Sequence, residues 1–374
     1  MKIISVVGAR PNFMKIAPFC QALKSHPEVR HILVHTGQHY DIRMSDSFFS
    51  ELGIPAPDIH LNIGSGTHAE QVGRTMMEFE KVVRAEHPDW VVVVGDVNAT
   101  CACSIVAKKE HVKLAHIEAG LRSGDMDMPE EVNRLVTDRL SDLLLTPDRI
   151  SNANLKAEGV PDARIRFVGN IMIDTLEAQR GKAASRPIRE LVKRELLDAA
   201  WALPDLRDNG FAVMTMHRPS NVDQPEILKP LVEFLTGEVA GDMPLLWPIH
   251  PRARKQLELF GLWEFVREKI ILLNPLGYHD MLRLNMGARL MLTDSGGLQE
   301  ECCVLGTPCL TLRWNTERPI TLKEHGGASV LVGNDVPKVR RAYRETLAAG
   351  RLPQRPELWD GHTAERIADA IINF

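Results

Sequence analysis

A dense row of charged residues occupies residues 116–134, HIEAGLRSGDMDMPEEVNR. The acids are Glu118, Asp125, Asp127, Glu130 and Glu131, and the arginines beside them are Arg122 and Arg134. Carboxylates held close together can remove a proton from a substrate and return it. Acids in the first turn of a helix that begins at a proline also complement the helix dipole, which explains Glu130 and Glu131 but leaves Glu118 unexplained.

The segment DSGGLQEE, residues 294–301, has the composition of a phosphate-binding turn. Its Ser-Gly-Gly triplet predicts a strand-to-helix turn whose free N–H groups can hold a diphosphate at the helix N-terminus. Glu300 or Glu301, one turn into that helix, could accept both hydroxyls of a ribose. The following RWNTERP segment places Arg318 where it could reach the same phosphates. The alternative is a glycine-rich turn with a serine cap and acids that complement the dipole.

Charged residues also follow other apolar runs. GARPNFMK has one glycine, whereas a dinucleotide fingerprint needs several, so Arg10 and Lys15 would supply cationic contacts instead. Asp96 follows VVVV in the segment GDVNAT, where it could face a ligand or help to cap the next helix. His217, in MHRPSN, is either a structural histidine or a group for phosphate binding and proton transfer.

Twelve short apolar runs alternate with amphipathic segments along the chain. Runs that are almost continuously apolar are typical of strands buried on both faces of a parallel sheet. The expected strands lie at 3–8, 31–37, 90–96, 113–120, 142–147, 165–170, 211–217, 245–251, 270–275, 288–294, 308–312 and 328–333. The amphipathic segments between many of them predict an α/β fold with right-handed crossovers.

This number of strands exceeds that of one eight-stranded barrel and predicts two doubly wound, Rossmann-like domains. The charged, helix-like region 176–206 marks the boundary, which gives an N-terminal domain over 1–175 and a C-terminal domain over 176–359. In architectures of this kind a final helix, here at about 360–374, can pack back on the first domain.

Ligands of parallel sheets bind at the carboxyl ends of the strands. The polar and charged residues named above follow expected strands, so they should collect at that edge of each sheet. Two such edges that face each other would form an interdomain cleft, where we expect the ligand to bind.

The composition is that of a globular protein of 374 residues, with 44% hydrophobic residues and a net charge of −4. Acids and bases are interspersed, so no basic arm indicates nucleic acid. No apolar run reaches membrane-spanning length and no signal peptide is recognisable, so we expect a cytoplasmic protein without a membrane partner. The six cysteines lack zinc or disulfide spacing, which predicts buried free thiols and no metal site.

Eight ordered motifs resemble those of the non-hydrolysing UDP-N-acetylglucosamine 2-epimerases. They are GARPNFMK, TGQHYD, GDVNAT, HIEAGLRSGDMDMPEEVNR, VGNIMIDTL, MHRPSN, DSGGLQEE and NTERP, within residues 3 to about 335. The resemblance implies the GT-B architecture, in which two Rossmann-like domains hold the active site in the cleft between them. It also implies interconversion of UDP-N-acetylglucosamine (UDP-GlcNAc) and UDP-N-acetylmannosamine (UDP-ManNAc). The implied route is anti elimination of UDP to 2-acetamidoglucal followed by re-addition, without a cofactor.

The resemblance also assigns roles to residues at matching positions. The implied catalytic residues are Asp96, Glu118, Glu130 and His217. The implied substrate-binding residues are Arg10, Lys15, Arg134, Ser295, Gly296, Gly297, Glu301 and Arg318. Within this set, Ser295 and Gly296 correspond to the diphosphate cradle and Glu301 to the ribose acceptor. The family further implies a homodimer and a product used in cell-surface polysaccharide synthesis.

Several alternatives stay open from the sequence alone. Sister enzymes that epimerise UDP-2,3-diacetamido-2,3-dideoxyglucuronic acid carry very similar motifs, so the substituents at C3 and C6 of the sugar are not fixed. A GT-B glycosyltransferase would also bind a UDP-sugar, and a non-catalytic nucleotide-sugar binding protein is a remoter hypothesis. Residues 38–46 and 64–68 differ from those of members that UDP-GlcNAc activates, so activation by substrate is open too.

Overall fold

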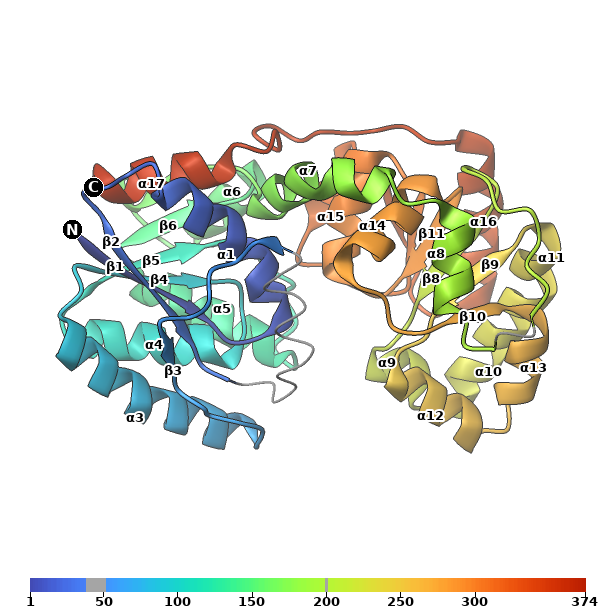
Figure 1. The fold of residues 1–374 in the computed structure, drawn as a ribbon, viewed down its shortest axis with the longest axis horizontal. Coiled ribbons are helices and arrows are strands. Elements are labelled where there is room, and N and C mark those ends of the chain that lie inside the picture. The colour runs from blue at the N-terminus through green and yellow to red at the C-terminus, as the bar shows by residue number, and fades with distance from the viewer. Residues whose placement is uncertain (38–51, 199–200) are drawn as a thin grey trace. The chain divides into compact units, whose positions relative to one another are not determined.

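The computed structural model describes residues 1–37, 52–198 and 201–374. The segment 38–46 and the side chains of Arg10 and Pro11 lie outside the described residues. The chain forms two compact units, one of Met1–Ala178 with Pro356–Phe374 and one of Gln179–Arg355. In each unit helices cover both faces of a parallel sheet (Figure 1).

The first unit contains a parallel sheet built around its N-terminal strand. Its described strands are β1 (Lys2–Val7), β2 (Arg30–His35), β3 (Ile59–His60), β4 (Trp90–Val94), β5 (Lys113–Ile117), β6 (Leu143–Thr146) and β7 (Ile165–Phe167). They lie in the order β3-β2-β1-β4-β5-β6-β7. The strand order reverses between β1 and β4, and such switch points are where doubly wound sheets bind ligands.

Two sets of helices cover this sheet. One face carries α3 (His68–Glu86), α4 (Asn98–Lys109) and α5 (Pro129–Leu140); the other carries α1 (Arg10–Leu23), α6 (Arg149–Ala157), α7 (Ile171–Ala184) and α17 (Thr363–Ile372) (Figure 1). A 3-10 turn, Asp162–Arg164, precedes β7. Alternate strand residues such as Ile4, Val6, Val91 and Val93 belong to one core cluster with residues of α3 and α4, because successive strand side chains point to opposite faces.

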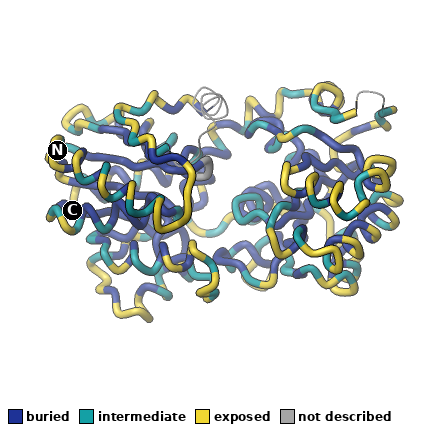
Figure 2. The backbone as a smooth tube through the Cα atoms, turned by 90° about the horizontal axis from the view of Figure 1, so that it is seen from below, coloured by how far each residue is buried: buried dark blue, intermediate teal, exposed yellow. Residues whose placement is uncertain are grey.

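The second unit repeats the arrangement. Its strands are β8 (Ala212–Thr215), β9 (Leu245–Pro248), β10 (Ile271–Leu273), β11 (Leu290–Thr293), β12 (Cys309–Thr311) and β13 (Ser329–Leu331). All pairs are parallel, in the order β10-β9-β8-β11-β12-β13. Figure 2 shows the strands of both units as buried segments and the helices as alternately buried and exposed ones.

Two hydrophobic clusters fill the layers of the second unit. One cluster involves α8 (Ile188–Glu195), α14 (Tyr278–Gly287) and α15 (Gly296–Leu305). The other involves α9 (Pro219–Val222), α10 (Pro225–Phe234), α12 (Pro251–Leu259), α13 (Trp263–Lys269) and α16 (Val336–Ala349). A π-helical turn, Leu235–Val239, joins α10 to α11 (Ala240–Asp242), and 3-10 turns occupy Pro319–Thr321 and Lys323–His325.

The predicted fold class is confirmed, and all twelve expected strands are present. The sequence prediction missed β3, a two-residue strand that pairs with β2 at the sheet edge and is too short to produce a hydrophobic pattern. All six cysteines are buried free thiols, as expected. Within the described ranges, we find no helix with the length and apolar character that crossing a membrane requires.

A carboxylate from α7 holds the C-terminal helix α17, which packs on α1. Asp174 accepts hydrogen bonds from the N–H groups of Thr363 and Ala364, at 3.1 and 2.6 Å, so it caps a helix that begins 189 residues later. Burial raises the pKa of Asp174 above its ordinary value, against the lowering effect of these N–H groups. In the motif VGNIMIDTL, Asp174 therefore has a structural role.

Replacing Asp174 by Ala should loosen α17. Two buried N–H groups then lose their acceptor, at a cost of about 1–3 kcal/mol each. The amides of residues 365–372 should exchange with solvent about tenfold faster or more, as measured by hydrogen–deuterium exchange. Asp369→Ala, at an exposed position of the same helix, is the control. Equal exchange rates in the two variants would contradict the capping role.

Candidate active site

The backbone of Glu118 is strained where β5 ends. Its φ of 76° lies in the left-handed region, which costs a residue other than glycine about 1–3 kcal/mol. The N–H groups of Glu118 and Ala119 both turn to the carbonyl of Leu145 on β6, at 3.0 and 3.1 Å. Strain of this kind collects at functional sites, and here it holds a carboxyl-bearing residue at the carboxyl end of the sheet.

Lys15, on α1, forms a buried ion pair with Glu118. Gly95, after β4, leaves room for this pair, because a Cβ there would lie 3.2 Å from Lys15 Nζ and 3.5 Å from Glu118 Oε2. The φ of Gly95 is 67°, a conformation that glycine adopts readily. Asn12, also on α1, donates from Nδ2 to the carbonyl of Val94 at 2.9 Å and so ties α1 to the end of β4.

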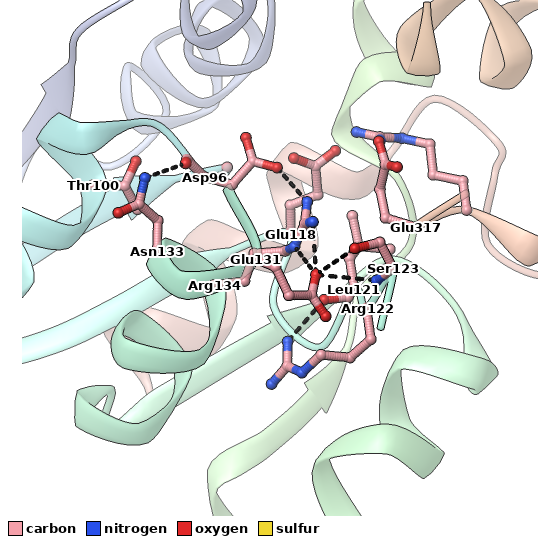
Figure 3. A network of polar contacts seen from close by, with 12 residues as sticks. Asp96, Thr100, Glu118, Leu121, Arg122, Ser123, Glu131, Asn133, Arg134 and Glu317 are labelled. Atoms are coloured by element: carbon pink, nitrogen blue, oxygen red, sulfur yellow. Dashed lines mark hydrogen bonds and ion pairs between the residues drawn. The ribbon is translucent and has the colours of Figure 1, made fainter. Parts of the chain in front are cut away.

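A second chain of charges runs from the end of β4 to α5 (Figure 3). Asp96 accepts a hydrogen bond from Arg134 at 2.5 Å, and Arg134 also donates to Glu131 from Nε and Nη2, at 3.0 and 2.7 Å. Asn133 donates to the main-chain oxygen of Asp96 at 2.9 Å. The side chains of Arg134 and Glu131 are each 2% exposed and that of Asp96 is 25% exposed, so Asp96 is the member most open to a ligand.

Glu131, which the sequence interpretation explained as a first-turn acid, organises the loop before α5. Its carboxylate accepts from the N–H groups of Ser123 and Gly124, each at 3.0 Å, and from the Ser123 hydroxyl at 2.9 Å. Burial opposes ionisation of Glu131, but these N–H groups and Arg134 outweigh it and hold its pKa below the ordinary value. Glu130 is exposed in the same helical turn, so the two adjacent acids differ completely in environment.

In the second unit, the buried carboxylate of Asp294 joins the end of β11 to the end of β8. Its Oδ2 accepts from the N–H groups of His217 and Arg218, at 2.9 and 2.8 Å, and from Asn221 Nδ2 at 3.1 Å. Its Oδ1 lies 2.9 Å from Nδ1 of His217. Burial opposes ionisation of Asp294, but His217 and the N–H of Arg218 outweigh it and keep its pKa below the ordinary value. The ring of His217, 41% exposed, is therefore fixed from behind by a residue that the sequence interpretation did not select.

The Ser-Gly-Gly turn begins α15 directly after Asp294. Ser295 is the N-cap residue, and its side chain makes no capping hydrogen bond. A Cβ at Gly296 would lie 2.8 Å from Glu317 Oε1 and 2.9 Å from Arg318 Nη1, so the NTERP segment packs against this glycine. Among the described residues nothing lies within 4 Å of a Cβ at Gly297. An anion could therefore approach the N–H groups at this helix end.

Arg318 lies in a buried row of alternating charges beside this turn. Glu317 pairs with Arg313 at 2.7 Å and also with Arg318, while Glu300 pairs with Arg318 Nε at 2.8 Å. Burial opposes ionisation of Glu317, but Arg318 and Arg313 hold its pKa well below the ordinary range. Two carboxylates thus neutralise Arg318, and the predicted contact with phosphates would require Arg318 to give up one of them.

Glu301 is buried on α15, with 3% of its surface exposed. Burial raises its pKa to about 7, although Tyr278 and Asn285 beside it act in the opposite direction. Its Oε2 has no hydrogen-bond partner in the described part of the chain. The hydroxyl of Tyr278 and Nδ2 of Asn285 also lack partners in the described part of the chain, so either a small movement of these donors or a ligand hydroxyl would satisfy this oxygen.

The structure brings together some of the predicted residues and separates others. In the first unit Lys15 meets Glu118 and Asp96 meets Arg134, while Glu130 points to solvent. In the second unit His217 and the Ser-Gly-Gly turn adjoin Asp294, while Glu301 and Arg318 are buried. Arg10 begins α1, and its side chain lies outside the described residues.

Comparison with known proteins decides the family. A model of the family described as UDP-N-acetylglucosamine 2-epimerase matches residues 21–372. The chain belongs to the UDP-N-acetylglucosamine 2-epimerase family. It is 41% identical over 372 residues to the UDP-N-acetylglucosamine 2-epimerase of Methanocaldococcus jannaschii, with 98% of both chains covered.

Other 2-epimerases resemble the chain in sequence and in structure. The UDP-2,3-diacetamido-2,3-dideoxy-D-glucuronate 2-epimerase of Pseudomonas aeruginosa is 40% identical over 377 residues, with 99% of both chains covered. The crystal structure of M. jannaschii UDP-GlcNAc 2-epimerase in complex with UDP-GlcNAc and UDP has a TM-score of 0.88 and 39% identity, with 100% of both chains covered. The expected family is thereby confirmed, and the roles of individual residues stay predictions.

Gly95→Ala should impair 2-epimerase turnover by displacing the Lys15–Glu118 pair. The new Cβ meets Lys15 Nζ at 3.2 Å, and the φ of 67° adds about 1–2 kcal/mol of strain. We expect turnover at saturating substrate to fall at least about tenfold in a steady-state assay. Gly124→Ala is the matched control. Its φ of 72° gives a similar strain, but no described residue lies within 4 Å of the Cβ that the substitution adds. Equal activity of the two variants would show that the space at Gly95 is not needed.

Proposed function

We propose that the protein catalyses epimerisation at C2, converting UDP-GlcNAc to UDP-ManNAc. The observation that carries the proposal is the pair of carboxylates at the strand ends, Asp96 and Glu118, each held by a buried cation, Arg134 and Lys15. Removing a proton from carbon and returning it requires fixed carboxylates of this kind. The similarity to the named 2-epimerase of M. jannaschii, over 98% of both chains, supports the same reaction.

The proposed mechanism avoids a free carbanion at C2, whose proton is barely acidic. A carboxylate takes the C2 proton while the bond from C1 to the diphosphate oxygen breaks on the opposite side of the ring. The electron pair released at C2 forms the C1–C2 double bond of 2-acetamidoglucal, and UDP leaves with the pair of the broken bond. UDP then adds back to C1 while a carboxylic acid delivers a proton to the other face of C2. The candidate acids are Asp96, Glu118 and Glu130.

In this proposal the second unit holds the leaving diphosphate and the ribose. The N-terminus of α15, at Ser295, Gly296 and Gly297, offers N–H groups and the positive end of a helix dipole. His217, fixed by Asp294, adds a ring nitrogen at the end of the neighbouring strand. Glu301 would accept the ribose hydroxyls. The further proposed substrate contacts are Arg10, Lys15, Arg134 and Arg318.

A second candidate substrate is UDP-2,3-diacetamido-2,3-dideoxyglucuronic acid. The observation that favours it is the 40% identity to the P. aeruginosa enzyme named for that sugar, which nearly equals the 41% identity to the M. jannaschii enzyme. The chemistry at C2 would be the same, so the two candidates differ in the groups that the site accepts at C3 and C6.

We further propose that the protein is a cytoplasmic homodimer whose product enters polysaccharide biosynthesis. The homodimer and the pathway follow from the resemblance to the family. The cytoplasmic location is proposed as the default for a sequence in which no apolar run reaches membrane-spanning length. Light scattering on the purified protein would test the oligomeric state directly.

Incubation with UDP-GlcNAc in deuterium oxide tests the reaction. We expect deuterium at C2 and new UDP-ManNAc signals in NMR spectra, because the proton of a catalytic carboxylic acid exchanges with solvent. A glycosyltransferase would not label C2. The diacetamido-uronic acid sugar is run alongside, and the absence of label and of new product with both sugars would contradict the proposal.

Asp96→Asn and Glu118→Gln should abolish turnover while UDP binding survives, because the proposed diphosphate cradle at Ser295 and Gly296 and the ribose acceptor Glu301 lie in the second unit. We expect turnover to fall by about 10²-fold or more in each variant. NMR spectroscopy measures the rate of epimerisation, and calorimetry measures the affinity for UDP. Asp127→Asn, which changes an exposed acid of the same stretch, is the control. Near-normal turnover in both variants would remove these residues from the mechanism.

UDP-GlcNAc binding should weaken as the pH falls through about 7, the raised pKa of Glu301. A ribose hydroxyl donates to the carboxylate, so binding favours the ionised form, which is lost below this pKa. The sugar-linked diphosphate does not titrate in this range. Calorimetry is done on the Glu118→Gln variant, which should bind UDP-GlcNAc without converting it. Below pH 7 the affinity should fall by up to about tenfold for each unit by which the pH is lowered. Glu301→Gln in the same background should flatten the profile, and an unchanged profile would contradict the assignment.

A further inference from the structure

One buried polar network of the first unit has no part in the proposed chemistry. It consists of His116 on β5, Asp138 on α5 and Arg122 in the loop between them. The side chains of His116 and Asp138 are 0% and 2% exposed. The network adjoins the two segments that carry Asp96 and Glu118, and the backbone hydrogen bonds of those segments show what it does.

The departure of β5 from the sheet leaves a carbonyl of the neighbouring strand without its ladder partner. The last ladder bond between the two segments runs from the N–H of Gly95 to the carbonyl of Ile117, at 3.1 Å. In a parallel pair, the next bond would run from the N–H of Ala119 to the carbonyl of Gly95. The N–H of Ala119 goes to Leu145 instead, at 3.1 Å. Because buried carbonyl groups are nearly always paired, Gly95 needs another donor.

His116 supplies that donor. Its Nε2 lies 2.9 Å from the carbonyl oxygen of Gly95, and its Nδ1 lies 2.6 Å from Oδ1 of Asp138. The other oxygen of Asp138 accepts from the N–H of Gly120 at 3.0 Å and pairs with Arg122 at 2.7 Å. The two side chains thus bind the backbone of both segments: His116 binds Gly95 after β4, and Asp138 binds Gly120 after the strained turn.

The hydrogen-bonding roles in this network are determined by its acceptors. Burial opposes ionisation of Asp138, but His116 and Arg122 outweigh it and hold the pKa of Asp138 below the ordinary value. A carbonyl oxygen can only accept, so Nε2 of His116 donates to Gly95, and the contact of Nδ1 with Asp138 holds the ring in this orientation. A satisfied network of buried charges resists movement, and this rigidity extends to the backbone that it binds.

We propose that His116 and Asp138 are positioning residues that hold the segments carrying Asp96 and Glu118 in the geometry required for proton transfer at C2. His116 acts on the carbonyl of Gly95, the residue before Asp96, and Asp138 acts on Gly120, two residues after Glu118. Both side chains are buried, and their contacts in this network are with the backbone and with each other and Arg122, so they act on the reaction only through the position of the two segments. The inference rests on the proposed function, because it concerns the support of that reaction's carboxylates.

Asp138→Ala and His116→Ala test the inference by removing these partners. We expect kcat to fall about 100-fold, since a displacement of about 1 Å can cost that much. The KM for UDP-GlcNAc and the affinity for UDP should change less than about threefold, because a group that acts on proton transfer alone leaves binding unchanged. More 2-acetamidoglucal and UDP should escape per epimerisation, since a misplaced acid returns the proton slowly.

Asp138→Asn separates the hydrogen bonds from the charge. Its Nδ2 can donate to Nδ1 of a neutral His116, and its Oδ1 can accept from Gly120 and Arg122, so every contact has a counterpart. We expect this variant to keep kcat within about fivefold of the wild type, as each hydrogen bond is retained. His31→Ala is the control, because it removes a partly buried histidine of β2 whose Nε2 lies 2.9 Å from the hydroxyl of Ser5 on β1.

Wild-type kcat in folded Asp138→Ala and His116→Ala proteins would overturn the inference. Parallel losses of UDP binding and kcat would also overturn it, because the network would then be merely structural. An Asp138→Asn protein as impaired as Asp138→Ala would contradict the role of the hydrogen bonds. Thermal unfolding of each variant establishes that it is folded. A wild-type protein without turnover would contradict the proposed function itself, whereas an active wild type with unaffected variants contradicts this inference alone.

Discussion

The departure of β5 from its sheet at Glu118 is the constraint on which the candidate site of the first unit depends. A strand that continued would satisfy its backbone in the ladder and would direct its side chains to the two faces of the sheet. The turn at positive φ instead keeps Glu118 at the carboxyl end of the strands, at a cost in backbone strain. It also leaves polar groups that need new partners. Lys15, His116 and Asp138 provide them from three separate elements.

Both units hold their candidate binding charges in buried pairs. Lys15 is matched by Glu118 in the first unit, and Arg318 is matched by Glu300 and Glu317 in the second. Removing one partner of a buried pair leaves a desolvated charge, which typically costs about 3–5 kcal/mol. A charged ligand that bound these groups would therefore exchange partners with existing pairs, and the unliganded protein keeps its buried charges balanced.

Local patterns in the sequence were sufficient to predict the fold and the strand ends that carry charged residues. Burial on both faces leaves a continuous apolar run, so strands such as β4 and β11 were recognisable. The contacts that organise the site could not be predicted from such local patterns. Glu131 binds a loop eight residues earlier, and Asp294 binds His217 across 77 residues. Pairings of this kind have no periodicity and depend on the packing of separate elements, which also explains why the burial of Arg318 could not be predicted.

The first unit consists of two stretches of chain, Met1–Ala178 and Pro356–Phe374, whereas the second is continuous. Helix α17, in the last stretch, packs on α1, the helix that carries Lys15. A ribosome therefore releases the whole second unit before it releases α17. The face of α1 that α17 covers therefore stays exposed until the last residues of the chain have left the ribosome. The first unit, although translated first, cannot complete its packing before the second unit has been translated.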